Sequence, residues 1–259
     1  MPMTLYHGEP AGPSLTVLAA LFESGLEADL VPIDLALAER HGGKVPLSFE
    51  ANYSVEGEGP VLLVDGEPTV DSVFIGCLLD DLAPDCGLRP RDPYARWEMM
   101  AWCRWIIERL APGAAALANI AWTTPRLAAL SDAAFAAMIA PIEADDLRAR
   151  WAQTRAGQLS DEHRAASEAR VHEAAKKIEE RLADRDWIMG VFSLADLESY
   201  AWIAPMRALI PAAFAERPRL AGWLERVAAR PSVTRALAQG RTAEPAHGFA
   251  PGPEINRWG

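Results

Sequence analysis

The stretch GPVLLVDGEPTVDS at residues 59–72 decides how the first part of the chain folds. Its apolar run 61–64 is rich in β-branched residues and predicts a strand. The dipeptide Asp65-Gly66 follows, and a type I′ hairpin turn needs residues that tolerate a positive φ at both central positions. Residues 69–70 close the return strand, and an apolar run suited to a helix comes next. The stretch therefore predicts a strand, a tight turn, a second strand and the start of a helix.

Asp71 and Ser72 stand where that helix begins. Two such side chains beside the free N–H groups of a helix N-terminus form a site for an anion. The alternative is that Asp71 only caps the helix. The residues alone leave both interpretations open.

The segment before this stretch predicts two more strands and one helix. Residues 3–6 form a first strand, and a loop with several glycines and prolines leads to Ser14. A helical pattern runs from Ser14 to Gly25, so we expect Ser14 to be the N-cap, or to present its hydroxyl at the positive end of the helix dipole. A second strand is expected at 28–35, where Pro32 indicates an edge position or a bulge.

The remainder of the chain predicts helices. The helix that begins at Ser72 is expected to run to about Ala83 and to complete an α/β domain at 1–83. A linker rich in proline follows at 84–93, then an all-helical domain at 94–240 and an irregular tail at 241–259 that lies over the surface. Within the helical part, Pro112-Gly113 is expected to interrupt or kink a helix.

Composition narrows the class of protein. The chain has 259 residues, half of them apolar, and a formal net charge of −11. This sign argues against nucleic acid and anionic membranes as partners. Three cysteines in no metal-binding spacing suggest reduced thiols and no metal site. No signal peptide is visible and the apolar runs are shorter than a membrane span, so we expect a soluble cytoplasmic protein.

Three motifs along the chain carry a resemblance to a known family. They are Gly59-Pro60 with Asp65-Gly66 and Asp71-Ser72, the capping box Ser193-Leu194-Ala195-Asp196, and Trp223-Leu224-Glu225-Arg226 with Arg230-Pro231-Ser232-Val233. In this order and at this spacing they resemble the cytosolic glutathione transferases, over residues 3 to about 238. The resemblance implies an α/β N-terminal domain of the thioredoxin type and an all-α C-terminal domain.

Within that family the sequence is most similar to the bacterial β-etherases that cleave lignin-derived aryl ethers. The shared features are Leu5-Tyr6, the glycine- and proline-containing loop before Ser14, Leu88-Arg89-Pro90, and a helix with Trp97, Trp102 and Trp105.

This resemblance implies glutathione as co-substrate. Ser14 would be the catalytic residue, donating a hydrogen bond to the glutathione thiolate. Ser72 would hold the γ-glutamyl carboxylate and Asp71 its ammonium group. The backbone of Gly59 would pair with the cysteinyl part of glutathione, before a Pro60 in the cis form.

The implied reaction is attack of the thiolate on the ether-bearing carbon of an aromatic substrate, with a phenolate as leaving group. The resemblance suggests an aromatic pocket between the domains, formed by Trp102, Trp105, Trp122 or Tyr200. For each of these rings the alternative is packing in the helical core.

Three functions remain open. The first is an active glutathione-dependent β-etherase or another glutathione transferase. The second is a non-catalytic subunit that stabilises an active partner in a heterodimer, suggested by Gly59 in place of the usual valine and by Glu56 and Glu58 in the loop before it. The third is an interaction or stress protein of the same fold. The first two imply a homodimer or a heterodimer.

Overall fold

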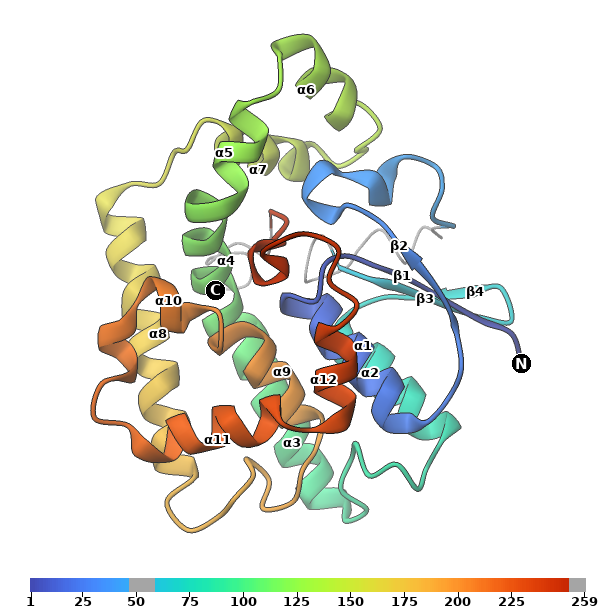
Figure 1. Cartoon of the computed structure of the whole chain (residues 1–259), viewed down its shortest axis with the longest axis vertical. Helices are drawn as coiled ribbons and strands as arrows, with labels where there is room; N and C mark the ends of the chain where they lie inside the picture. The colour runs from blue at the N-terminus through green and yellow to red at the C-terminus, as the bar shows by residue number, and fades with distance from the viewer. Residues whose placement is uncertain (47–58, 252–259) are drawn as a thin grey trace.

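The computed structural model describes residues 1–46 and 59–251. A four-stranded sheet forms the N-terminal part, in the order β2-β1-β3-β4 (Figure 1). Strands β1 and β2 are parallel, and the other neighbours are antiparallel. The strands are β1 (Met3–His7), β2 (Asp29–Pro32), β3 (Val61–Val64) and β4 (Glu67–Thr69).

The local predictions around the sheet are confirmed. Asp65 and Gly66 join β3 to β4 with φ values of 51° and 90°, as a type I′ turn requires. Pro32 ends β2, which is an edge strand, so its missing N–H removes no ladder bond from the sheet interior. Gly25 ends the first helix in the left-handed conformation, with a φ of 70°.

Helices make up the rest of the described chain. Helices α1 and α2 pack against each other, and α1 also packs against α9 and α12. The α-helices are α1 (Gly12–Ser24), α2 (Ser72–Leu82), α3 (Pro93–Trp105), α4 (Ala111–Ala118), α5 (Thr124–Ala128), α6 (Asp132–Ile139), α7 (Asp145–Arg155), α8 (Asp161–Arg181), α9 (Leu194–Ile203), α10 (Met206–Leu209), α11 (Pro218–Ala228) and α12 (Pro231–Leu237). Short 3₁₀ turns are η1 (Leu35–Leu37), η2 (Glu39–His41), η6 (Pro211–Phe214) and η7 (Pro245–His247).

The predicted interruption at Pro112-Gly113 is wrong. Helical structure continues from α3 to α5 through two π-helical segments, η4 (Ile106–Leu110) and η5 (Asn119–Thr123). The N–H of Ala111 donates to the carbonyl of Ile106, five residues earlier, and Pro112 comes directly after. Pro125 follows η5 in the same way. A π turn loosens the helix where a proline lacks its N–H and crowds the preceding carbonyl, so the helix passes through both prolines.

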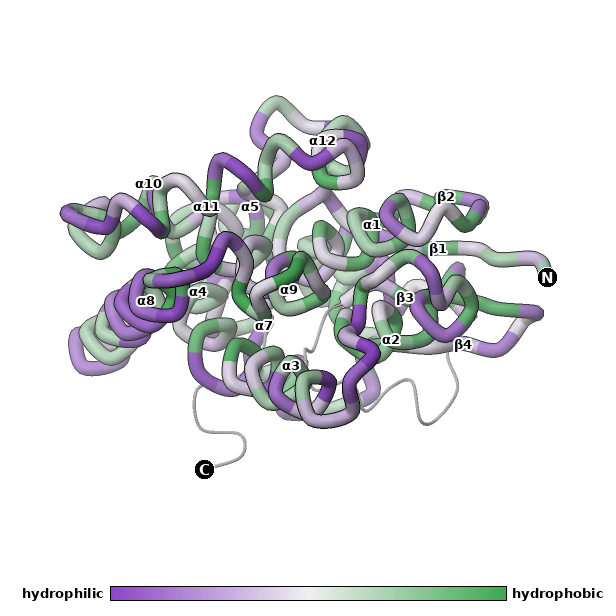
Figure 2. Tube along the Cα trace, turned by 90° about the horizontal axis from the view of Figure 1, so that it is seen from below, coloured by the Kyte–Doolittle hydropathy of each residue, from purple (hydrophilic) through white to green (hydrophobic). Residues whose placement is uncertain are grey.

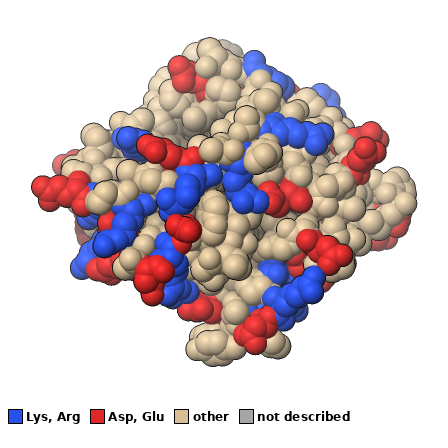
Figure 3. Space-filling view, turned by 60° about the horizontal axis from the view of Figure 1, so that its bottom comes forward, with Lys and Arg blue, Asp and Glu red and all other residues tan. Residues whose placement is uncertain are grey.

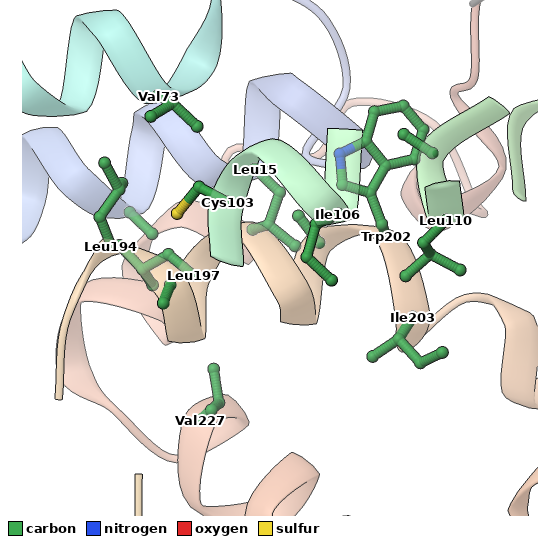
Figure 4. Packing of buried hydrophobic residues seen from close by; sticks show 14 of the residues in the cluster. Leu15, Val73, Cys103, Ile106, Leu110, Leu194, Leu197, Trp202, Ile203 and Val227 are labelled. Atoms are coloured by element: carbon green, nitrogen blue, oxygen red, sulfur yellow. The ribbon is translucent and has the colours of Figure 1, made fainter. Parts of the chain in front are cut away.

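Helix α9 lies at the centre of the molecule. Its capping box is present as predicted, with the N–H of Ser193 donating to the Asp196 carboxylate at 3.0 Å. Side chains from α1, α2, α3 and α9 meet in one core, where Leu15, Val73 and Leu197 are buried (Figure 4). By contrast, α8 presents a hydrophilic stretch at the edge of the molecule (Figure 2). Within the described ranges, no helix combines the length and hydrophobicity that crossing a bilayer requires.

Part of the C-terminal tail is buried in the fold. Residues 245–247 form η7, and Phe249 is only 4% exposed instead of lying over the surface. Its ring packs against those of Trp122 and Trp202, at centroid distances of 5.9 and 5.8 Å. Residues 252–259 lie outside the described residues.

Candidate active site

The topology brings several predicted site residues to one end of the sheet. Because β3 is antiparallel to both β1 and β4, those two strands run in the same direction. Helix α1 follows β1 and α2 follows β4, so both helices begin at the same end. Strand β3 starts there too, because Val61 pairs with Tyr6 near the end of β1. This end of the sheet therefore carries two helix N-termini and the backbone that enters β3.

Ser14 lies at this end, but not as the N-cap. The N-cap of α1 is Ala11, and Gly12 and Pro13 form the first helical positions, so that prediction is wrong. Proline suits the first turn because its φ is already helical and its missing N–H has no intrahelical partner there. The Ser14 hydroxyl is 1% exposed and accepts the N–H of Gly8 at 3.0 Å. The hydroxyl oxygen lies in the first turn of α1, at the positive end of the helix dipole.

The loop between β1 and α1 is fixed by buried polar groups. His7 is buried and its Nδ1 donates to the carbonyl of Gly8 at 2.8 Å, while burial lowers the pKa of His7. The Glu9 carboxylate accepts the backbone N–H of Arg241 at 3.0 Å and lies 3.5 Å from the Arg241 guanidinium. A Cβ placed on Gly12, which has a φ of 48°, would lie 3.4 Å from the Phe249 ring. The C-terminal segment therefore covers the start of α1.

Asp71 and Ser72 occupy the start of α2. Asp71 is the N-cap by position, but its side chain accepts no capping hydrogen bond, so simple capping does not explain it. Its φ of 65° and ψ of 123° are unusual for a residue with a side chain, and such strain concentrates at functional sites. The Ser72 hydroxyl has no exposed surface and donates to Glu198 Oε2 at 2.8 Å.

Gly59 and Pro60 are buried immediately before β3. The described residues contain no cis peptide bond, so the predicted cis form of Pro60 is wrong. An X–Pro bond favours the trans isomer by about 0.5–1 kcal/mol unless a tight turn selects cis, and Pro60 enters an extended strand instead. Glu56 and Glu58 lie outside the described residues.

Glu198 was not anticipated from the sequence. It lies on α9 with no exposed surface, and its second oxygen, Oε1, accepts the indole N–H of Trp202 at 2.8 Å. Burial raises the pKa of Glu198, and the nearby Asp71 raises it further. The available signal was a glutamate four residues before a tryptophan, on a helix expected to be largely buried. Its partner Ser72 lies 126 residues away, which no local pattern reveals.

The four predicted aromatic residues do not form one pocket. Trp102 is 8% exposed and donates to Ser199 at 2.9 Å, and the Lys177 ammonium lies 4.1 Å from the Trp105 ring centroid. Both rings therefore pack among α3, α8 and α9, as in the core alternative. Tyr200 packs edge-on against Trp223, and burial raises its pKa. Trp122 stacks on His247 at 4.2 Å and lies near the start of α1 through Phe249.

A cavity of about 530 Å³ lies instead between α4, η5, α7 and α8. Its lining includes Asn119, Arg150, His163, Arg170 and Pro251, and none of the four aromatic residues. Asn119 is 7% exposed, and its Oδ1 accepts no hydrogen bond from the residues that the structure describes. This volume suits a small organic molecule.

The next features are the possible metal ligands and the cysteine thiols of the described residues. No group of three or more metal-binding side chains gathers within 1–46 and 59–251. The three cysteines are free, and burial raises the pKa of the Cys103 and Cys77 thiols. These thiols are therefore poor nucleophiles.

Comparison with known proteins decides the family. Residues 129–231 match the family described as Glutathione S-transferase, C-terminal domain. The chain is also 30% identical to Protein LigF of Sphingobium sp. (strain NBRC 103272 / SYK-6) over 253 residues, which cover 90% of this chain and 92% of LigF. The chain belongs to the glutathione transferase family.

Solved structures agree with this assignment. The crystal structure of Beta-etherase LigF from Sphingobium sp. strain SYK-6 superposes on this transferase with a TM-score of 0.80 at 26% identity, covering 93% of this chain and all of the other. A beta-class glutathione S-transferase of Sphingomonas chungbukensis has a TM-score of 0.64 at 22% identity, covering 91% of this chain and 98% of its own. A transferase homolog from Sulfitobacter, solved with bound glutathione, has a TM-score of 0.58 at 20% identity, covering 92% of this chain and 98% of its own. The last two show the shared fold.

Proposed function

We propose that this transferase uses glutathione to cleave a β-aryl ether of a lignin-derived aromatic compound. One observation carries the proposal: Ser14, Asp71 and Ser72 lie at the same end of the sheet, at two helix N-termini. The likeness to a β-etherase supports the choice of substrate.

Each residue has a defined role in this proposal. The N–H groups at the start of α2, with Ser72, attract the γ-glutamyl carboxylate, and Asp71 pairs with the ammonium group. The backbone at Gly59 and Pro60 pairs with the cysteinyl part of glutathione, as an added strand does. Ser14 donates its hydroxyl proton to the thiolate and, with the dipole of α1, lowers the pKa of the thiol from its ordinary value of about 8.5.

The proposed reaction is a single displacement step. The thiolate sulfur attacks the carbon that bears the aryl ether oxygen, a C–S bond forms and the C–O bond breaks. The phenolate leaves with the electron pair and takes a proton from solvent. Trp122 contacts Phe249, which lies at the start of α1, so we place the aromatic substrate beside Trp122.

Substitution of Ser14 tests the proposal. We expect Ser14→Ala to lower kcat/KM with a chromogenic aryl ether about 10- to 100-fold, because one hydrogen bond to a charged group contributes about 1.5–3 kcal/mol. Ser24→Ala, on the same helix but at its other end, is the control and should retain full activity. The wild type should also bind to immobilised glutathione. If the wild type is not retained on immobilised glutathione and releases no phenolate, the proposal is ruled out.

One observation favours a second candidate, a non-catalytic subunit that stabilises an active partner. The Ser72 hydroxyl is already bonded to Glu198, away from a ligand. This function predicts co-purification with a second transferase chain and no turnover by this chain alone. A homodimer with turnover would exclude it. Location in the cytoplasm belongs to both proposals and agrees with the free cysteines.

A further inference from the structure

Glu198 is a buried carboxyl group, and each of its two oxygens accepts a hydrogen bond, while the nearby Thr16 hydroxyl also favours its charged form. Oε2 receives the Ser72 hydroxyl and Oε1 receives the Trp202 indole N–H, both at 2.8 Å. In the part of the chain that the structure describes, no lysine, arginine or histidine forms a hydrogen bond or an ion pair with it. A buried carboxylate without a cation is costly, so this group needs a reason to persist.

Two acidic groups of the described residues act on Glu198. Asp71 approaches it from the cap of α2, and Cys103 from α3. Asp196 lies on the same helix as Glu198 and, like it, acts on Cys103. An additional negative charge at the start of α2 would lie near Asp71 and would favour the neutral form of Glu198. The γ-glutamyl carboxylate of the proposed co-substrate is such a charge, while the ammonium group of the same ligand pairs with Asp71 and offsets part of the effect.

The geometry accommodates both protonation states without moving a heavy atom. When Glu198 is ionised, it accepts both hydrogen bonds. When Oε2 carries a proton, it donates that proton to the Ser72 oxygen, while Oε1 still accepts from Trp202. The Ser72 hydroxyl then has its own proton free to donate elsewhere. A single proton therefore reverses the Ser72–Glu198 hydrogen bond.

We propose that Glu198 is a positioning residue that takes up a proton when glutathione binds, which frees the Ser72 hydroxyl to donate to the γ-glutamyl carboxylate. The proton comes from solvent and no covalent bond changes. This inference rests on the proposed function, because it assumes that glutathione binds at the start of α2.

Calorimetry of S-methylglutathione binding tests the inference. This probe keeps the γ-glutamyl group but has no thiol to ionise, so thiolate formation cannot release a proton. Titrations in buffers of different ionisation enthalpy, at steps from about pH 6 to 9, count the protons exchanged. We expect the wild type to take up as much as about one proton per site between the free and bound pKa values of Glu198. Within that window its affinity should fall about tenfold per pH unit, and above the window it should level off at the value of the ionised state.

Two variants and a control show whether Glu198 is the group that takes up the proton. In Glu198→Gln the amide donates permanently to Ser72 and accepts from Trp202, so we expect binding with no proton uptake and no pH dependence over this range. Ser72→Ala removes the hydroxyl that accepts a hydrogen bond from protonated Glu198, so proton uptake should fall in this variant as well. Glu67→Gln removes an exposed carboxyl of β4 and should leave the uptake unchanged.

The outcomes separate the two proposals. Binding by the wild type without proton uptake at any pH overturns the inference alone. Uptake that persists in Glu198→Gln overturns it too, because the proton then goes elsewhere. A purely structural role for Glu198 would change the affinity but not the number of protons. No binding of S-methylglutathione overturns both the inference and the proposed function.

Discussion

At the scale of single residues, the buried carboxyl groups of α9 are the most informative. Asp196 accepts the N–H of Ile188 at 3.0 Å and the indole N–H of Trp223 at 2.9 Å, besides closing the capping box. Burial nevertheless raises the pKa of Asp196 to about 6. The desolvation of this carboxylate therefore outweighs the hydrogen bonds that favour its charged form.

The raised pKa of Asp196 determines whether the stability of the fold rises or falls with pH. The folded protein holds the Asp196 proton more tightly than the unfolded chain, whose aspartates titrate near about 3.9. The resulting stability is fully present below about pH 4 and is lost as the pH rises through about 6, on the order of 3 kcal/mol in total. The carbon-13 shift of the Asp196 carboxyl should titrate with a midpoint near this pKa. A midpoint near that of an exposed aspartate would contradict the expectation.

The residue scale also shows what the sequence could reveal. The capping box at Ser193 and Asp196 could be predicted, because both partners lie within one helical turn. The role of Glu198 could not, because its partner Ser72 belongs to another helix far along the chain. Ser14 was predicted at the start of the first helix, but its exact position was missed because Gly12 and Pro13 begin the helix earlier.

At the scale of elements, the contact between α4 and α8 depends on a glycine. A Cβ on Gly113 would lie 3.1 Å from the backbone oxygen and 3.3 Å from the Cα of Ser167. Backbone atoms cannot turn away as a side-chain tip can. The dipeptide that suggested a helix break is therefore a place where two helices approach closely.

We expect Gly113→Ala to lower the free energy of unfolding by about 1–3 kcal/mol, because the crowding exceeds the gain in helix propensity. Gly222→Ala in α11 is the matched control. Its Cβ would meet only the flexible end of Arg226, at 3.4 Å, so it should raise stability by about 0.5–1 kcal/mol. Urea unfolding measures both. Equal effects of the two substitutions would refute the close-approach argument.

Elements differ in how far local sequence determines them. The hairpin at Asp65-Gly66 was predictable because its turn chemistry lies in two residues. The continuity through Pro112 was not, because the rule that proline ends a helix has an exception in π turns. Tertiary packing also determines helix α7: most of its residues are polar or charged, yet Trp151 is fully buried in a second cluster with Leu127 and Phe135.

At the scale of the whole molecule, the C-terminal segment joins regions that are distant in sequence. The hydroxyl of Thr123 donates to the carbonyl of Phe249, and the Phe249 ring contacts Trp122 and Trp202.

Positive and negative charges are mixed on the surface of the molecule. Despite the net charge of −11, lysines and arginines lie beside acidic residues over the face in Figure 3.

Removal of the Phe249 ring should loosen this segment. We expect Phe249→Ala to lower the free energy of unfolding by up to about 3 kcal/mol, because a buried phenylalanine loses its contacts. Trypsin should then cut faster after Arg241. Glu244→Ala, an exposed substitution in the same segment, should change neither quantity. Unchanged proteolysis of Phe249→Ala would show that the ring does not hold the segment in place.

The buried Phe249 also has a consequence for biosynthesis. The ribosome makes α1, η5 and α9 before it reaches residue 249, and N-terminal parts of a chain fold first. Until then, Gly12 and the Trp202 ring lack the phenylalanine that covers them. A nascent chain stopped before residue 245 would contain the sheet and helices α1–α12, with the start of α1 still uncovered. The candidate site is therefore completed late in synthesis, after the scaffold that supports it.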